Sequence, residues 1–197
     1  MIVLGITGGI ASGKSTIASI FAATGIPVFD ADRVIHEAYA APTTELTRAF
    51  PAAVSGGVVN RKRLSEALET DPDLLAELEA ITHPIVRARA EAFLEDSRQA
   101  GQKIVALDVP LLFETGLDLL CDHTLVAIAP AQIRRGRVRE RGSMSEGLFR
   151  RLVERQIPDQ DKIEKADYVV DTDAPIADVE RVIRTIVDDL TVPNDRS

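Results

Sequence analysis

Short apolar runs alternate with helix-like patterns along most of the chain. The runs have the length and the continuous apolar character of strands that are buried on both faces of a parallel sheet. Between the first two runs, Ile17, Ile20 and Phe21 recur at helical spacing, and Gly25 ends that pattern. The alternation predicts an α/β fold, a three-layer doubly wound parallel sheet. Its five strands are expected at residues 2–6, 26–29, 104–108, 124–128 and 168–171.

The segment 33–102 has a different pattern, because its apolar residues follow a helical period. It predicts a helical lobe inserted between the second and third strands. Gly56-Gly57 and Asp71-Pro72 are expected to form turns within the lobe. Thr82-His83-Pro84 predicts a helix boundary, because proline disfavours helical backbone at the residue before it.

The chain of 197 residues is acidic, with 23 Lys and Arg against 31 Asp and Glu and a net charge of −8. This overall field opposes binding to a polynucleotide, so no nucleic-acid partner is expected. No apolar run approaches the ~18 residues of a membrane span, so no membrane partner is expected. Cys121 is the single cysteine, which fits a reducing compartment and predicts a cytoplasmic location.

The segment Gly8-Gly9-Ile10-Ala11-Ser12-Gly13-Lys14-Ser15 matches the phosphate-loop (P-loop) pattern G-x-x-x-x-G-K-[ST] between a predicted strand and a predicted helix. Its glycines let backbone N–H groups turn toward phosphate oxygens. We therefore expect a P-loop NTPase type of fold that binds a nucleoside triphosphate, with Lys14 at the β and γ phosphates and Ser15 holding Mg²⁺. The alternative is a glycine-rich turn that only connects strand to helix. The residues expected to bind the triphosphate are Gly9, Ala11, Ser12, Gly13, Lys14, Ser15 and Thr16.

Carboxylates follow two of the predicted strands at their carboxyl ends, where open α/β sheets bind ligands. Asp30 and Asp32 are expected on opposite faces of an extended segment, so that one faces the phosphates and accepts the proton of a substrate hydroxyl. The alternative for either residue is an N-cap of the following helix. Asp108 ends an apolar strand, the Walker B arrangement that supports Mg²⁺ directly or through water.

Arginine is concentrated in one part of this acidic chain. Eight of the eighteen arginines lie between Arg134 and Arg155. Arg134, Arg137 and Arg141 fall on one helical face, and the segment has only a thin apolar stripe. We expect residues 130–156 to form a lid whose guanidinium groups stabilise the transferring phosphoryl group. A plain solvated helix is the alternative.

Taken together, these motifs resemble the dephospho-CoA kinase family over nearly the whole length of the chain. The phosphate loop alone is shared with other small kinases, whereas the Thr-His-Pro and Asp-x-Pro-Leu-Leu-Phe-Glu segments are more specific. The segments that carry the resemblance are Ile6-Thr7-Gly8-Gly9-Ile10, Asp30-Ala31-Asp32, Ile81-Thr82-His83-Pro84, Asp108-x-Pro110-Leu111-Leu112-Phe113-Glu114, the lid arginines, Gln156-x-Pro158 and Ala166-Asp167-Tyr168-Val169-Val170-Asp171.

The resemblance implies ATP-dependent phosphorylation of the ribose 3′-hydroxyl of dephospho-CoA, which gives CoA and ADP in the last step of CoA synthesis. It implies a single P-loop kinase domain over residues 1–197, with 33–102 as the CoA-binding lobe. Asp32 is then the general base and Arg141 the lid arginine at the phosphates, while Arg137 binds ATP and Arg139 stays open as an alternative register. Together with Lys14, Asp32 and Arg141 form the implied catalytic set, Ser15 and Asp108 the metal ligands, and the implied substrate contacts are His83, Asp108, Pro110 and Leu111.

Two features depart from the family's pattern. Ala11 stands where the family usually has Gly, which the loop tolerates if φ is negative there. The segment 51–63 fits poorly, so contacts to the pantetheine arm are not assigned.

Two other functions remain open at this stage. A nucleoside monophosphate kinase would keep the phosphate chemistry and change the acceptor, although the apolar, low-aromatic lobe weighs against it. A nucleotide-dependent switch would bind triphosphate and signal by conformation, but no Asn/Thr-Lys-x-Asp segment for guanine selection is present. The sequence does not indicate the oligomeric state.

Overall fold

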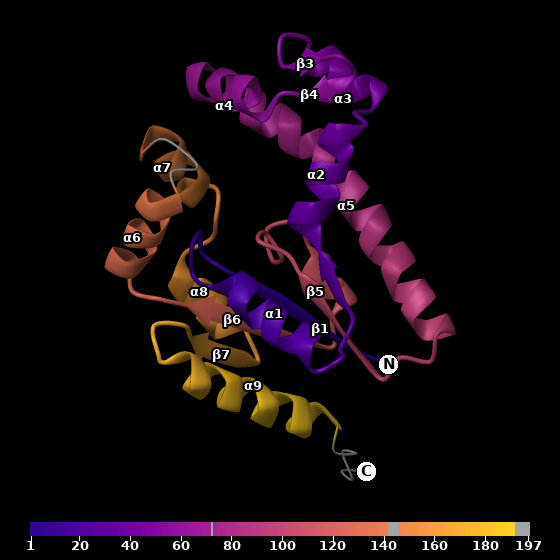
Figure 1. Cartoon of the computed structure of the whole chain (residues 1–197), viewed down its shortest axis with the longest axis vertical. Coiled ribbons are helices and arrows are strands. Elements are labelled where there is room, and N and C mark those ends of the chain that lie inside the picture. Colours follow the sequence, from indigo (N-terminus) through magenta and orange to yellow (C-terminus); the bar gives the residue numbers. More distant parts are fainter. Residues whose placement is uncertain (72, 142–145, 192–197) are drawn as a thin grey trace.

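Strand β1 (Ile2–Gly8) lies at the centre of a five-stranded sheet with the order β2-β5-β1-β6-β7 (Figure 1). The computed structural model describes residues 1–71, 73–141 and 146–191. The other four strands are β2 (Val28–Asp30), β5 (Ile104–Asp108), β6 (His123–Ile128) and β7 (Tyr168–Asp171). All neighbouring strands run parallel, which confirms the predicted doubly wound sheet.

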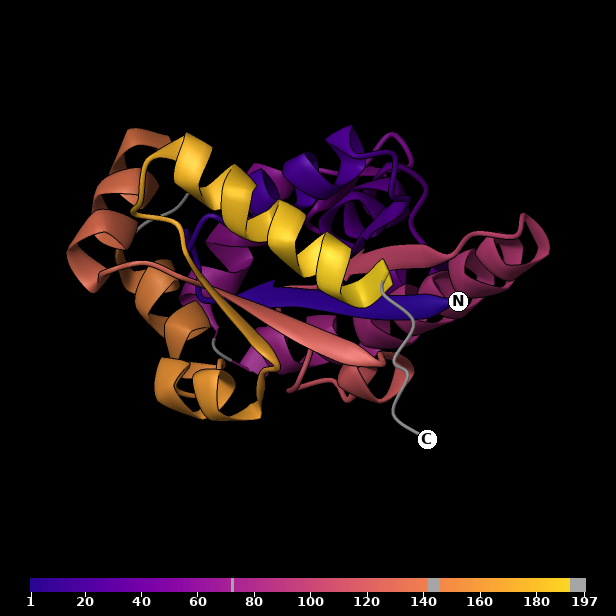
Figure 2. The same ribbon diagram turned by 90° about the horizontal axis from the view of Figure 1, so that it is seen from below.

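Helices cover both faces of this sheet, because successive side chains of each strand point to opposite sides. Leu4 and Ile6 of β1 pack with α1 (Lys14–Ala23) and α9 (Ile176–Thr191), which runs along the sheet in Figure 2. Val3 packs on the other face, with residues of α2 (Ala31–Ala40) and α5 (Asp73–Gln99). The strands are buried on both faces for this reason, which explains their continuous apolar runs.

Helices occupy most of the segment 33–102, and together with α2 they form a lobe at the end of the molecule opposite α9 (Figure 1). The lobe contains α3 (Thr44–Ala49), α4 (Arg61–Thr70) and the first half of α5. It has its own apolar core, which includes Leu46, Leu64 and Leu78. A short hairpin of β3 (Val54–Ser55) and β4 (Val58–Val59) interrupts the helices, and Gly56-Gly57 forms its turn.

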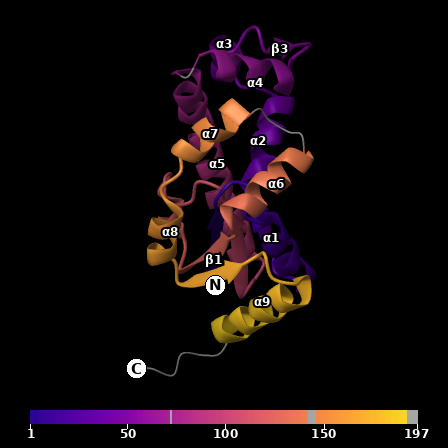
Figure 3. The same cartoon turned by 90° about the vertical axis from the view of Figure 1, so that its left-hand side faces the viewer.

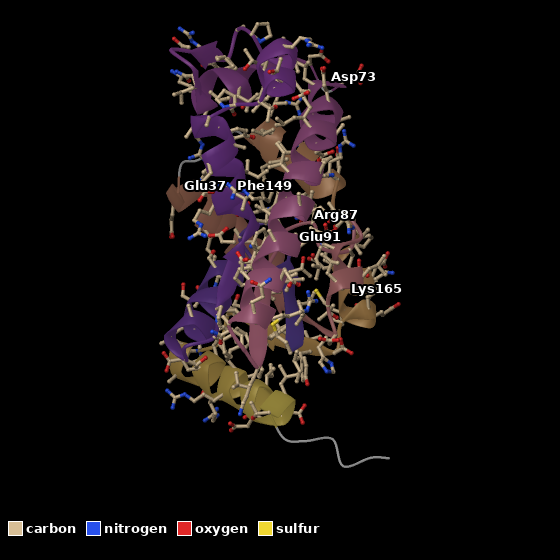
Figure 4. The ribbon with its side chains drawn as sticks, turned by 90° about the vertical axis from the view of Figure 1, so that its right-hand side faces the viewer. Glu37, Asp73, Arg87, Glu91, Phe149 and Lys165 are labelled. Carbon is tan, nitrogen blue, oxygen red and sulfur yellow. The ribbon has the colours of Figure 1, made fainter. Side chains whose placement is uncertain are left out.

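Contacts between α2 and α5 join the lobe to the sheet. Glu37 of α2, labelled in Figure 4, accepts a hydrogen bond from Arg89 of α5 at 3.3 Å. Arg87 and Glu91 lie one turn apart on α5 in the same view, 3.6 Å from nitrogen to oxygen. The chain passes twice between the two parts, through α2 and α5, so residues at the start of α2 lie between the sheet and the lobe.

Helix α5 runs without a break through Pro84, so the predicted helix boundary at Thr82-His83-Pro84 is wrong. Thr82 and Val86 are buried, and the Thr82 hydroxyl donates to the carbonyl of Leu78 at 2.8 Å. Packing on both sides of the proline therefore outweighs the lost backbone hydrogen bond. Asp71-Pro72, the other predicted turn in this region, follows the end of α4. Pro72 lies outside the described residues.

The arginine-rich region forms α6 (Ala131–Arg141) and α7 (Glu146–Glu154), followed by α8 (Asp159–Lys165). Figure 3 shows α6 and α7 at the side of the molecule, between α9 and the lobe. Leu148 of α7 belongs to the lobe core, so this region contacts the lobe as well as the loop after β1. A short 3-10 helix, η1 (Leu117–Leu120), precedes β6. None of the helices in the described part of the chain combines the length and apolarity that crossing a membrane requires.

The turn between β1 and α1 contains two residues in the left-handed backbone region. Gly13 has φ +90°, and a Cβ at that position would lie 2.6 Å from the Thr172 hydroxyl oxygen, so only glycine fits. Ala11 has φ +59°. The structure therefore does not meet the condition of negative φ under which the loop accepts alanine without strain.

We predict that Pro84→Ala raises the free energy of unfolding by about 1–3 kcal/mol, because it restores the hydrogen bond to the Ala80 carbonyl in an exposed stretch of helix. Urea denaturation monitored by circular dichroism measures the change. Ala88→Pro, one turn further along α5, is the reciprocal control and is expected to cost about 3 kcal/mol. A loss of stability in Pro84→Ala would contradict this account of α5.

A second prediction concerns the left-handed alanine. Ala11→Gly is expected to raise the free energy of unfolding by about 0.5–1 kcal/mol, because glycine removes the steric cost of positive φ and loses part of that gain to chain entropy. Ala22→Gly, at an exposed position in the last turn of α1, is the matched control and is expected to lose about 0.5–1 kcal/mol. Equal destabilisation by the two substitutions would show that Ala11 is not strained.

Candidate active site

The loop after β1 encloses a cavity of about 350 Å³ at the carboxyl end of the sheet. Residues 8–15 form one wall, which places Gly9, Ala11, Ser12, Gly13, Lys14 and Ser15 together as predicted. The opposite walls come from distant parts of the chain, which the sheet and the lobe bring close. They consist of Asp32, Glu79, Pro110, Leu111, Leu152, Arg155 and Gln156.

Lys14 and Asp108 form a buried ion pair at the base of the loop. Their side chains are 13% and 7% exposed, so solvent screens the pair only weakly. Burial raises the pKa of Asp108, the nearby Lys14 lowers it, and the charges of Asp30 and Asp32 raise it further. A phosphate that enters the cavity would therefore meet a lysine that is already held in position.

The segment after β5 is anchored to β1. The backbone N–H of Val109 donates to the carbonyl of Ile6 at 2.9 Å, and the Thr7 hydroxyl donates to the carbonyl of Pro110 at 3.1 Å. Leu112 is fully buried beneath this segment. Pro110 and Leu111 consequently present a fixed wall to the cavity opposite the loop.

The expectation that Asp30 and Asp32 lie on opposite faces of one extended segment is wrong. Residues two apart in a strand point to the same face, and here Asp30 ends β2 while Asp32 lies in α2. Helix α2 begins at Ala31, directly after β2, because the Asp30 carboxylate accepts a hydrogen bond from the Arg33 backbone N–H at 2.9 Å. The capping interpretation therefore holds for Asp30. Asp32 lies in the first turn of α2, is exposed, and lines the cavity of the loop.

Two further cavities meet the first one at Asp32. The smaller, of about 270 Å³, is mainly apolar and lies between α2, α5 and the segment after β5, with Ile35, Val86 and Leu111 in its wall. His83 lines this cavity, 51 positions from Asp32 in the sequence. The larger, of about 740 Å³, extends along the lobe and is lined by polar side chains of α2 and α4 as well as by leucines.

Arg137 reaches the loop from α6. Its guanidinium donates to the carbonyl of Ala11 at 3.2 Å, to the Thr172 hydroxyl at 3.1 Å and to the Thr172 carbonyl at 2.9 Å. The Thr172 hydroxyl in turn donates to the carbonyl of Ser12. Sequence reasoning missed Thr172, although its place directly after the strand β7 is a signal that could have found it.

The other arginines of α6 lie in different surroundings. Arg134 forms an ion pair with Asp159 at 2.8 Å and lies against Gly9. Arg139 lines a different cavity, together with Arg135 and Gln132. The side chain of Arg141 lies outside the described residues. Thr16, in the first turn of α1, is exposed and does not line the cavity.

A second set of charged contacts joins α8 and the residues before it to the segment after β5. Lys162 of α8 is 1% exposed, and its Nζ lies 3.6 Å from Oε1 of Glu114. The same oxygen accepts a hydrogen bond from the backbone N–H of Ile157 at 2.9 Å. Burial lowers the pKa of Lys162, and the neighbouring Glu114 and Asp159 oppose that change.

Arg155 forms an ion pair with Glu79 of α5, with 3.5 Å between Nη1 and Oε2. Neither this pair nor that of Lys162 with Glu114 has a sequence signal, because their members are far apart in the chain.

Side-chain oxygens at the site suit a hard cation, which phosphate oxygens of the substrate would also bind. Among residues 1–71, 73–141 and 146–191, no three His, Cys, Asp or Glu side chains cluster as an all-protein metal site. Ser15 lines the cavity, and the Asp108 carboxylate lies beside Lys14. One or two protein oxygens together with substrate phosphates are the usual ligands of Mg²⁺ in kinases, so these residues fit that ion.

The comparisons with known proteins identify the family of the chain. The family model described as dephospho-CoA kinase matches residues 2–178. A dephospho-CoA kinase of Brucella melitensis is 42% identical over 194 residues, which cover 97% of this chain and 96% of the relative. One of Mesorhizobium japonicum is 44% identical over 193 residues, with 96% of this chain and 97% of the relative covered.

Solved structures extend the likeness to the fold. A Thermus thermophilus protein matches with a TM-score of 0.77 at 35% identity, over 96% of this chain and 98% of its own. The dephospho-CoA kinase of Campylobacter jejuni matches with a TM-score of 0.69 at 23% identity, over 95% and 96% of the two chains, which shows the fold alone. Neither a nucleoside monophosphate kinase nor a switch is then needed to explain the motifs. The chain belongs to the dephospho-CoA kinase family, the phosphotransferases of the final step of coenzyme A biosynthesis.

Proposed function

We propose that Asp32 is the general base in the transfer of the γ-phosphoryl group of ATP to the 3′-hydroxyl of dephospho-CoA. The observation that carries this assignment is the position of Asp32, which lines the phosphate-loop cavity and both further cavities. A hydroxyl presented from the lobe side and a phosphoryl group presented from the loop side would meet at this carboxylate. The exposure of Asp32 keeps it accessible to both.

The phosphate-loop residues bind the triphosphate in this proposal. Backbone N–H groups of Gly9, Ala11, Gly13 and Ser15 are proposed to face the phosphate oxygens, and the N-terminus of α1 adds a favourable dipole. The Ser12 N–H is engaged within the loop, because it donates to the carbonyl of Gly9 at 3.0 Å. The Ser12 hydroxyl supports this role, because it is buried and has no hydrogen-bond partner among the described residues. Thr16 continues the same binding segment. Phosphate oxygens compete with Asp108 for Lys14, which then stabilises the charge on the transferring group.

The reaction itself is an in-line displacement. The acceptor oxygen forms a bond to the γ-phosphorus while the bond from that phosphorus to the oxygen bridging it to the β-phosphate breaks, and ADP leaves with the electron pair. The acceptor's proton passes to the Asp32 carboxylate. Positioning and charge stabilisation supply most of the acceleration in such transfers, so the rigid wall of Pro110 and Leu111 contributes by aligning the acceptor.

Kinases of this family use ATP and a metal ion. We propose that the ion is Mg²⁺ and that the Ser15 hydroxyl and the Asp108 carboxylate hold it, in keeping with the oxygen donors present. When bound, Mg²⁺ neutralises charge on the β and γ phosphates. The buried environment of Asp108 would make its carboxylate a strong partner for such a cation.

The lid arginines would complete the charge stabilisation. Arg137, which already reaches the loop backbone, is proposed to bind ATP. Arg141, one turn further along α6, is proposed as the arginine that meets the transferring phosphoryl group. Arg139 lines another cavity, together with Arg135 and Gln132, which argues against the alternative register.

The lobe formed by residues 33–102 is proposed to bind the acceptor. Dephospho-CoA is the small-molecule substrate that the family implies. His83, Pro110 and Leu111 line the apolar cavity at Asp32, and Asp108 lies beside Asp30 in the neighbouring strand. These four residues are proposed as the contacts of the acceptor. The net charge of −8 supports a small acceptor rather than a polynucleotide or an anionic membrane surface. The unpaired Cys121 supports a cytoplasmic location.

The proposal predicts that Asp32→Asn lowers kcat by about 10²- to 10⁴-fold and leaves KM for ATP unchanged, because the base acts on the acceptor and not on the triphosphate. Steady-state kinetics with dephospho-CoA measure both constants. Asp30→Asn is the matched control. It changes the same charge two residues away and keeps a good N-cap, so its kcat is expected to stay within about 3-fold of the wild-type value.

A large loss of ATP affinity in Asp32→Asn would contradict the assignment. It would indicate that Asp32 helps to hold the metal ion or has a structural role. Equal losses of kcat in the two variants would indicate a general effect of negative charge at this end of the sheet.

A further inference from the structure

The cavity of about 740 Å³ beside the lobe contains basic side chains that the mechanism does not use. Arg61 and Lys62 of α4 line it together with His36 and Tyr39 of α2. Six leucines form much of the remaining wall, namely Leu64, Leu68, Leu75, Leu78, Leu148 and Leu152. Since the same cavity reaches Asp32, it opens onto the place where the acceptor hydroxyl is proposed to react.

Within the described part of the chain, neither Arg61 nor Arg63 of the same helix has a carboxylate partner, and of the two only Arg61 lines this cavity. Lys62 lies 3.9 Å from Glu66, and Arg33 lies 3.6 Å from Glu37. In a chain with a net charge of −8, a guanidinium group that lines a cavity without a carboxylate is suited to an anionic ligand.

The geometry of α2 relates Arg61 to Asp32. Asp32, His36 and Tyr39 lie at positions i, i+4 and i+7, on one helical face that spans about 10 Å along the axis. Arg61 lies near the far end of this row. Burial raises the pKa of Tyr39, the charge of Arg61 lowers it, and the charge of Asp32 raises it, so both groups act on the same tyrosine.

This distribution of charge matches the acceptor proposed above, on which the inference rests. Dephospho-CoA carries its reactive 3′-hydroxyl and an anionic 5′-diphosphate on the same ribose. With the hydroxyl at Asp32, the diphosphate has to lie some distance away in a region that attracts negative charge. We propose that Arg61 binds this diphosphate and makes the enzyme specific for acceptors that carry one. Arg61 itself is exposed, so an incoming diphosphate can reach its guanidinium group.

The test compares Arg61→Gln in the full-length enzyme on two acceptors. Dephospho-CoA carries the diphosphate, whereas 5′-deoxyadenosine keeps the ribose 3′-hydroxyl and lacks it. For dephospho-CoA we expect KM to rise about 10- to 100-fold, the range for loss of a charged hydrogen bond, with kcat within about 3-fold. For 5′-deoxyadenosine, kcat/KM is expected to stay within about 2-fold of the wild-type value. KM for ATP is expected to be unchanged.

Arg63→Gln is the matched control, because Arg63 loses the same charge on the same helix and does not line the cavity. It is expected to behave as the wild type with both acceptors. Arg61→Lys keeps the charge and loses the bidentate geometry, so its KM for dephospho-CoA is expected between those of the wild type and Arg61→Gln. This variant also tests the inference if Arg61→Gln does not fold.

An unchanged KM for dephospho-CoA in Arg61→Gln would overturn the inference, as would equal losses with both acceptors or equal effects in Arg63→Gln. These outcomes differ from failure of the proposed function. If the wild-type enzyme phosphorylates dephospho-CoA and Arg61→Gln does so equally well, only the role of Arg61 is wrong. If the wild type does not phosphorylate dephospho-CoA, the proposed function itself fails.

Discussion

Strand β1 forms parallel ladders with β5 on one side and β6 on the other, and this register determines which side chains meet beyond its carboxyl end. Ile6 lies beside Asp108 of β5, and Asp108 lies beside Asp30 of β2. The phosphate loop leaves β1 two residues later, so Lys14 can reach back to Asp108. A shift of register in this sheet would separate the loop, the buried carboxylate and the start of α2, and no site would remain.

Electrostatics at this place work against the net charge of the chain. An acidic protein has to hold two anionic substrates, and three aspartates lie at the carboxyl ends of β2 and β5 or just beyond. Lys14 offsets the most buried of them, Asp108, while Asp30 is satisfied by capping α2. Arginines of α6 supply positive charge from the opposite side. Local pairing, and not net charge, therefore determines the electrostatic environment at this end of the sheet.

The sequence allowed the sheet and the phosphate loop to be predicted because both are local patterns. Continuous apolar runs indicate strands that are buried on both faces, and the glycine-rich motif indicates the backbone conformation of a phosphate loop. Tertiary packing was harder to foresee. Pro84 lies inside α5 because Thr82 and Val86 are buried around it, and Ala11 adopts positive φ within the loop.

The least predictable features were contacts between distant segments. Arg155 with Glu79, Lys162 with Glu114, and Thr172 with the loop join parts of the chain whose proximity depends on the whole fold. The sequence allowed Asp32 to be chosen as a candidate base. It did not indicate that Asp32 lines three cavities at once. Nor did it indicate the unpaired state of Arg61 in its cavity.

The central claim is that this fold phosphorylates dephospho-CoA at the ribose 3′-hydroxyl. The most direct measurement incubates the enzyme with ATP and Mg²⁺ and with dephospho-CoA, AMP or no acceptor, and follows each acceptor by mass spectrometry. The account predicts that dephospho-CoA alone gains one phosphoryl group, with one ADP formed for each. Transfer to AMP, or slow loss of ATP that does not depend on an acceptor, would contradict it.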